Sequence, residues 1–187
     1  MNAIIVIASS AGGLAPLRRI VAALPPGCSA SVFVVQHIGA NRSHLPDLLS
    51  ACGSLRAAFA RHGETIALGR IYVAPPDHHM RLRFGAISLD QGAKVHFARP
   101  AADPLFISAA ETYGERVVGI VLSGSNGDGA DGMLAITAHG GHGLVQDPSE
   151  AEWPEMPLAT LKHDHPEAAL TGDRLAERVA AICARTD

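Results

Sequence analysis

The sequence predicts an α/β fold: a three-layer, doubly wound, mostly parallel sheet with helices on both faces, Rossmann-like, together with a small β-hairpin. Apolar β-branched runs alternate along the chain with segments whose apolar residues recur at helical spacing. Of the residues, 48% are hydrophobic and only 4% are aromatic, which is typical of a buried parallel sheet. The 187 residues suit a single domain, 1–187, with a sizeable core.

Residues that break regular structure divide the first half into elements. Pro25-Pro26-Gly27 must end the first helix, whereas Pro16 is tolerated in that helix's first turn. Apolar and polar residues alternate on both sides of Phe84-Gly85-Ala86, which indicates a hairpin. The predicted order is a strand at 4–7, a helix at 14–24, a strand at 31–38, a helical pattern at 44–60 interrupted at Gly53, a strand at 69–74 and the hairpin at 80–89.

The second half continues the alternation. Asp103 is expected to cap the next helix, with Pro104 at its first position, and Thr171 or Asp173 to cap the last one. The predicted order is a helix at 104–113, a strand at 116–122, a helix at 133–138, a strand at 143–147, a short helix at 158–161, a surface turn at 163–165 and a closing helix containing Leu175, Val179 and Ile182.

Charge, cysteine content and hydropathy exclude several classes of protein. The net charge of −3 with neutral histidines gives no basic surface for nucleic acid. Cys28, Cys52 and Cys183 are odd in number and widely spaced, so we expect reduced thiols in a cytoplasmic protein. No apolar run approaches the roughly 18 residues of a membrane span, and the N-terminal run is too short for a signal peptide. We therefore expect no membrane insertion.

The turn after the first strand, Ala8-Ser9-Ser10-Ala11-Gly12-Gly13, has several interpretations. It matches a dinucleotide fingerprint poorly, and it lacks the lysine of a phosphate-binding P-loop. It does match the G-x-S-x-G nucleophile elbow, with alanine in first place and Ser10 at the nucleophile position. The plain alternative is a turn of small residues with a capping serine. This stretch alone leaves the last two interpretations open.

Two further polar residues close predicted buried strands. His37 ends the second strand, and Asp128 lies in the glycine-rich loop 123–132 after the strand at 116–122. Each has an ordinary structural interpretation, as a strand-end histidine or a solvated turn carboxylate. Because parallel strands bring their carboxyl ends to one edge, both can converge on Ser10. Nucleophile, base and orienting carboxylate are the parts of a serine hydrolase, in an order unlike that of α/β-hydrolases.

Metal and cofactor sites are not predicted. Adjacent His78 and His79 point apart on a strand, and no third ligand lies at a recognisable spacing. The loop 128–132 lacks the spacing and the distal glutamate of a calcium-binding EF-hand. We expect neither a metal nor an organic cofactor.

Seven short motifs along nearly the whole chain resemble the catalytic domain of the chemotaxis protein-glutamate methylesterase, the CheB family. They are Ile7-Ala8-Ser9-Ser10-Ala11-Gly12-Gly13, Val35-Gln36-His37, Tyr72-Val73-Ala74-Pro75-Pro76-Asp77-His78-His79, Arg99-Pro100, Leu122-Ser123-Gly124, Gly127-Asp128-Gly129 and Met156-Pro157. The resemblance implies that Ser10 is the nucleophile, His37 the base and Asp128 the orienting carboxylate. It also implies hydrolysis of glutamate γ-methyl esters on chemoreceptors or a related signalling protein, with glutamine deamidation as a second activity.

The chain departs from the family pattern in the site loops. The family usually has Gly where Ala8 stands, Thr where Ala11 stands, and Gly-Met-Gly where Gly124-Ser125-Asn126 stands. The family's oxyanion hole uses backbone N–H groups, so the amides of Ala11 and Ser125 can still serve. These departures affect the expected substrate more than the triad.

Two classes of function follow. The first is a stand-alone methylesterase; the alternative is a non-catalytic or repurposed module that docks to a signalling partner on the same fold. The related chemotaxis enzyme carries a receiver domain before its catalytic domain, whereas this chain begins at the first strand, so we expect regulation, if any, from a separate receiver-domain protein. We further expect a site open to solvent, because the nearby loops 75–80 and 148–157 contain prolines that restrict their shape.

Overall fold

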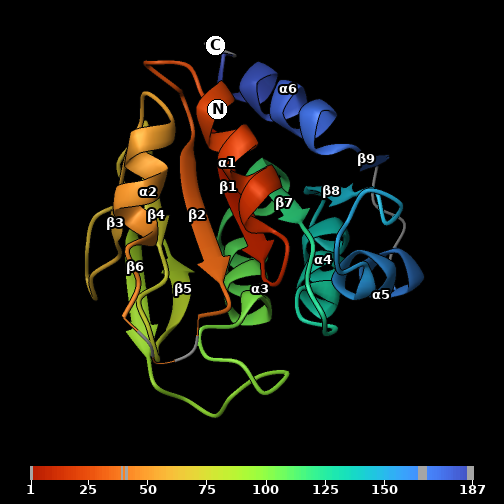
Figure 1. The fold of residues 1–187 in the computed structure, drawn as a ribbon. Helices are drawn as coiled ribbons and strands as arrows, with labels where there is room; N and C mark the ends of the chain where they lie inside the picture. The colour runs from red at the N-terminus through yellow and green to blue at the C-terminus, as the bar shows by residue number, and fades with distance from the viewer. Residues whose placement is uncertain (1, 39, 41, 164–167, 185–187) are drawn as a thin grey trace.

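The computed structural model describes residues 2–38, 40, 42–163 and 168–184, and its main feature is a seven-stranded sheet (Figure 1). The strand order is β3-β4-β2-β1-β7-β8-β9, and every pairing in it is parallel. The strands are β1 (Ile4–Ser9), β2 (Ser31–Gln36), β3 (Arg56–Phe59), β4 (Arg70–Val73), β7 (Val117–Val121), β8 (His142–Gln146) and β9 (Ala168–Leu170). The predicted doubly wound α/β sheet is therefore confirmed.

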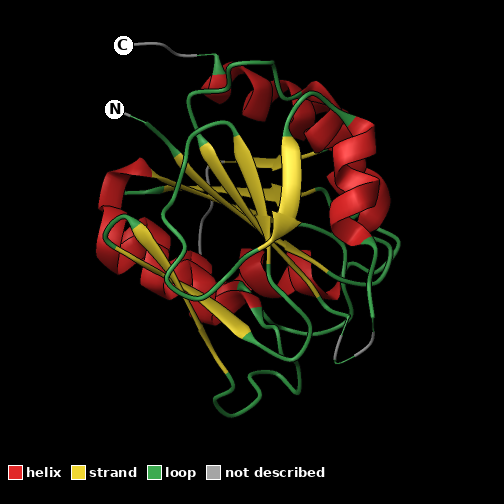
Figure 2. Cartoon of the chain, turned by 90° about the vertical axis from the view of Figure 1, so that its left-hand side faces the viewer, coloured by secondary structure: helices red, strands yellow, loops and turns green. Residues whose placement is uncertain are grey.

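Helices cover both faces of the sheet (Figures 1 and 2). One face packs against α1 (Leu14–Ala23), α2 (Leu45–Cys52) and α6 (Gly172–Cys183). The other packs against α3 (Ala102–Tyr113), α4 (Ala130–Ala138), α5 (Glu155–His163) and the predicted hairpin, β5 (His79–Arg83) with β6 (Ala86–Asp90). A single turn of 3₁₀-helix, Gly114–Arg116, leads into β7.

Strand β1 is the centre of the molecule. All six of its residues are buried; Ile5 and Ile7 belong to one core, and Ile4, Val6 and Ala8 to the other. β2 pairs with one edge of β1 and β7 with the opposite edge. The carboxyl ends of these three strands therefore lie side by side, at the point where the winding of the sheet reverses.

One strand was predicted wrongly as helix. The helical pattern over 44–60 holds only to Cys52, and Arg56–Phe59 forms the edge strand β3. Ser50 in α2 ties this strand to the helix: its hydroxyl accepts from the Ala57 amide at 2.9 Å and donates to the Ala57 carbonyl at 3.2 Å. A short edge strand containing two alanines carries little β signal, so pairing with β4 decides its conformation.

Other element boundaries also differ. Strand β9 was not predicted, α5 begins three residues before the predicted 158–161 helix, and α4 begins at Ala130. Helix α3 begins at Ala102, so Asp103 lies inside its first turn and does not cap it. Thr171 does cap α6, its hydroxyl accepting from the Arg174 amide at 3.4 Å. Of the predicted turn at 163–165, position 163 ends α5 and the other two lie outside the described residues.

Within the described part of the chain, no helix has the length and apolar character that crossing a membrane requires.

The two leucines at the start of α1 provide a test of the packing. Leu17 lies on the inner face of α1 and is fully buried, whereas Leu14 is 39% exposed. We expect Leu17→Ala to lower the free energy of unfolding by roughly 2–5 kcal/mol, because it leaves a cavity in a close-packed core. Leu14→Ala should change it by less than about 1 kcal/mol. Chemical denaturation of both variants measures the difference, and equal losses would contradict the packing described here.

Candidate active site

Ser10 lies in the tight turn between β1 and α1. Ser9, the last residue of β1, is fully buried, whereas Ser10 is half-buried. The Ser10 amide donates to the Ser123 carbonyl at 3.0 Å, and the Gln36 side-chain amide donates to the Ser10 carbonyl at 3.0 Å. A side chain at Gly13 would collide with the Ser9 hydroxyl and lie 2.9 Å from the Ser123 carbonyl oxygen. The small residues of the turn thus let the backbone after β1 approach the backbone after β7.

His37 is the neighbour of Ser10 across the strand ends. Because Ser9 pairs with Gln36, Ser10 and His37 each follow the last residue of adjacent parallel strands. The His37 amide donates to the Ser9 carbonyl at 3.0 Å. The His37 ring directs Nε2 toward Asp128, with 2.7 Å between Nε2 and Oδ2. Among the described residues no hydrogen bond joins the Ser10 hydroxyl to the ring, so Nδ1 is the ring nitrogen left to act on it.

Asp128 is a fully buried carboxylate at the end of the loop between β7 and α4, two residues before the helix begins. Besides His37, it accepts from the amides of Ala102 at 2.5 Å and Asp103 at 3.0 Å, which belong to the first turn of α3. Burial favours the neutral acid, but the hydrogen bond and charge of His37, with the two amides, outweigh burial and lower the pKa of Asp128. Asp128 is therefore held as a carboxylate.

Two backbone amides near Ser10 are free. Ala11 and Ser125 are both exposed, and neither uses its N–H in a hydrogen bond within the described residues. The close approach of the two loops depends on Gly124, where a side chain would collide with Met156 and lie 2.7 Å from Ser10 Cβ. The amides of Ala11 and Ser125 can therefore donate to a negatively charged oxygen formed beside Ser10.

Several supporting residues were not identified from the sequence. The Ser123 amide donates to the buried Gln146 Oε1 at 2.9 Å, and the Ser123 hydroxyl donates to the Ala11 carbonyl at 2.7 Å. Asn126 Oδ1 accepts from the Asp128 amide at 3.1 Å. This Asn126 contact is an Asx turn, which an Asn two residues before the aspartate could have indicated. The contacts of Ser123 and Gln146 join segments far apart in sequence and leave no local signal.

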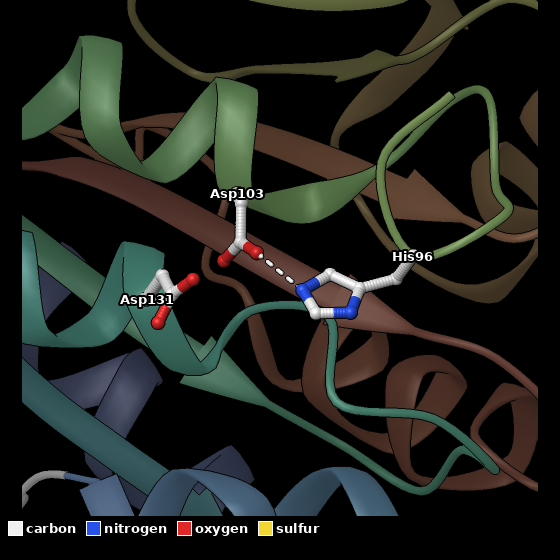
Figure 3. Close-up of side chains that lie close together, drawn as sticks. All are labelled: His96, Asp103 and Asp131. Carbon is white, nitrogen blue, oxygen red and sulfur yellow. Dashed lines mark hydrogen bonds and ion pairs between the residues drawn. The ribbon is translucent and has the colours of Figure 1, made fainter. Parts of the chain in front are cut away.

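The histidines near the site differ in how their side chains are used. His79 uses both ring nitrogens on backbone groups: Nε2 lies 3.0 Å from the Ala93 carbonyl, and Nδ1 accepts from the Ala101 amide at 3.3 Å. Of the described residues, His96, Asp103 and Asp131 could hold an ion, because their donor atoms lie within 4.8 Å of one another (Figure 3). They come from three separate segments, so their spacing in the sequence did not indicate the group.

A cleft of about 330 Å³ lies next to this edge of the sheet, reaching Gln36. Leu14 and Leu48 line it, and each is more than a third exposed. Its remaining lining residues are Ile38, Ser43, His44 and Leu45. The surface beside Ser10 and His37 is thus partly apolar.

Comparison with known proteins gives a consistent result. The family model described as CheB methylesterase matches residues 5–179. The chain is 39% identical over 184 residues to protein-glutamate methylesterase/protein-glutamine glutaminase 2 of Caulobacter vibrioides, covering 95% of this chain and 53% of that protein. The chain thus spans about half the length of that relative.

Other relatives match over nearly their whole length. A Leptospira interrogans protein, provisionally named for the same two activities, is 35% identical, with coverage of 92% of this chain and 91% of the relative. The crystal structure of the Thermotoga maritima CheB methylesterase catalytic domain superposes with a TM-score of 0.91 at 28% identity, over 97% of this chain and 99% of that one. Fold, motifs and family model agree, and the chain belongs to the CheB methylesterase family.

Proposed function

We propose that this chain is a serine hydrolase that cleaves glutamate γ-methyl esters on a chemoreceptor or a related signalling protein, yielding glutamate and methanol. Deamidation of glutamine side chains is proposed as a second activity, since the named relatives carry both. The observation that carries the proposal is the 2.7 Å pair of His37 and Asp128 at the strand end adjacent to Ser10. A hydroxyl, an imidazole, a buried carboxylate and two free amides suit acyl transfer.

The proposed reaction has two stages. The Ser10 oxygen attacks the ester carbonyl carbon while His37 Nδ1 takes the hydroxyl proton, and the amides of Ala11 and Ser125 stabilise the oxyanion. His37 then returns the proton to the departing methoxide, so methanol leaves and an acyl-enzyme remains. Water, deprotonated by His37, attacks the acyl carbon; the C–O bond to Ser10 breaks, and the proton returns to the serine oxygen.

Asp128 sets which ring nitrogen of His37 works as the base. In the general serine-triad arrangement the carboxylate holds Nδ1 and the serine faces Nε2. Here Asp128 holds Nε2, so it keeps the proton on that nitrogen and leaves the lone pair on Nδ1. Its buried charge also stabilises the imidazolium that forms when the serine proton is transferred.

The partner proposed from this site is another protein. The nucleophile is half-buried at a strand end and the adjoining cleft is open and partly apolar, with Leu14 and Leu48 exposed. Such a surface suits a side chain presented by a folded partner. We propose a cytoplasmic setting, since Cys28, Cys52 and Cys183 are all free thiols. We propose that a separate receiver-domain protein modulates this activity without being required for it.

Methanol release from a methylated receptor fragment tests the proposed activity. We expect the purified chain to release methanol without a phosphodonor or second protein, with an initial burst if acyl-enzyme hydrolysis is slower than acylation. Stable binding without methanol release would favour the alternative, a docking module. Release that requires an added receiver-domain protein would show that the resting site is closed.

Ser9 and Ser10 give a matched pair of variants. Ser10→Ala should abolish hydrolysis while the fold stays intact, because it removes only the nucleophilic oxygen. Ser9→Ala should retain activity, because Ser9 is fully buried and its hydroxyl makes no hydrogen bond among the described residues. The assay is the rate of methanol release, with circular dichroism to check the fold. Activity in Ser10→Ala together with its loss in Ser9→Ala would reverse the assignment.

Asp128→Asn tests the role of the carboxylate. The amide is nearly the same size but carries no charge and can present a donor to His37 Nε2, which puts the ring in the wrong tautomer. We expect turnover to fall roughly 10⁴-fold, as in other triads, with little change in KM. Steady-state kinetics on the methylated fragment measures both constants, and a loss below about tenfold would be inconsistent with this role.

A further inference from the structure

Helices α3 and α4 cap each other through two buried aspartates. Asp128, just before α4, accepts from the first-turn amides of α3. Asp103, in the first turn of α3, uses Oδ1 to accept from the amides of Gly129 at 2.9 Å and Gly132 at 2.8 Å. Gly129 is the N-cap residue of α4 and Gly132 lies in its first turn. Each helix therefore receives its capping carboxylate from the other, at positions where helix amides have no partner of their own.

The packing between these helices leaves little room for adjustment. A side chain at Gly132 would have its Cβ 2.5 Å from Phe106 Cβ and 3.1 Å from Asp103 Oδ1. Gly129 has φ +95, a conformation that other residues rarely adopt, and it directly follows Asp128. The backbone that carries Asp128 is thus anchored on its far side by Asp103.

The surroundings of Asp103 disfavour its negative charge. Burial and the neighbouring charge of Asp128, with a contribution from Asp131, raise the pKa of Asp103 to about 6. His96 opposes this, because its Nε2 lies 3.1 Å from Asp103 Oδ2. Figure 3 marks this contact with a dashed line. No lysine or arginine forms an ion pair with Asp103 or Asp128 among the described residues. The repulsion between Asp103 and Asp128 is therefore offset by the hydrogen bonds that Asp103 accepts from the α4 amides and by the neighbouring His96.

We infer that Asp103 is a positioning residue for the hydrolytic reaction: by capping α4 while Asp128 caps α3, it holds Asp128 in line with His37. His96 supports it by donating to the oxygen that the α4 amides do not use. The inference rests on the proposed function, since it assigns Asp103 a role through Asp128. Asp103 is not a catalytic residue, because its carboxylate contacts neither Ser10 nor His37.

Two variants of Asp103 separate its hydrogen bonds from its charge. Asp103→Ala removes both acceptor contacts to the α4 amides, and we expect kcat to fall roughly 10- to 100-fold with KM unchanged, as for a displaced catalytic group. Asp103→Asn keeps Oδ1 as acceptor, so kcat should recover to within about fivefold of wild type. The matched control is Glu111→Gln, which removes a negative charge from an exposed position of the same helix and should leave kcat unchanged.

The split between the two kinetic constants provides a readout that a merely structural role would not change. Asp103 acts on the reaction only through the orientation of Asp128 and His37, so loss of its contacts should lower kcat and leave KM unchanged. The charges facing Asp103 are those of Asp128, His96 and Asp131.

Stability provides a readout that needs no substrate. The folded-state pKa of about 6 lies above the ordinary value of 3.8, so the folded protein binds the Asp103 proton more tightly than the unfolded chain. The resulting stabilisation is complete below about pH 4 and is lost as pH rises through about 6. Wild type should lose this contribution across the window, and Asp103→Asn should not, in denaturation curves measured from pH 4 to 7.

The outcomes decide between the two proposals. A folded Asp103→Ala with wild-type kcat, an effect confined to KM, or an Asn variant as impaired as the Ala variant each overturns the positioning role. If Asp103→Ala does not fold, Asp103→Ser takes its place, because its shorter side chain withdraws the acceptor from the α4 amides, and a wild-type kcat in that variant overturns the role. If wild type releases no methanol, the proposed function fails, while the pH-dependent stability difference still tests the buried charge of Asp103.

Discussion

The buried carboxylate of Asp128 is the interaction on which the site depends. It has no exposed surface, and it keeps its charge because three N–H donors point at it: one from His37 and two from the start of α3. Charge-assisted hydrogen bonds of this kind contribute on the order of 1.5–3 kcal/mol each. A helix N-terminus adds up to roughly 2 kcal/mol in partly buried geometry. A single side chain thus orients the histidine and satisfies the end of a core helix.

That arrangement follows from where β1 lies in the sheet. β2 lies on one edge of β1 and β7 on the other. The ends of these three strands therefore place Ser10, His37 and the loop that contains Asp128 at the same edge of the sheet. The loops can meet there only because small residues line the contact: Gly13 faces the Ser123 carbonyl, and Gly124 faces Ser10. Bulk at either position would separate the serine from the amides that could stabilise an oxyanion beside it.

The departures from the family pattern are accommodated in specific ways. Ala8 is fully buried in β1 within the core that includes α3 and α4. Asn126 uses its side chain to accept from the Asp128 amide, so it shapes the loop from within. Ser125 is exposed, and its amide makes no hydrogen bond to any residue that the structure describes. These replacements leave the His37–Asp128 pair intact, and of the three only Ser125 lies on the exposed surface.

The sequence by itself determined the fold class, because buried parallel strands and amphipathic helices leave periodic patterns that need no knowledge of distant contacts. It also indicated Ser10, His37 and Asp128, since each follows a recognisable strand. Only the tertiary structure decided that Arg56–Phe59 is a strand, because an alanine-containing edge strand takes its conformation from its neighbour. The same holds for Asp103: a local capping rule assigned it to its own helix, whereas its carboxylate reaches amides 26 and 29 residues away on α4. The choice of Nε2 for Asp128 was likewise set by how the strand ends and α3 meet, which no local pattern in the sequence records.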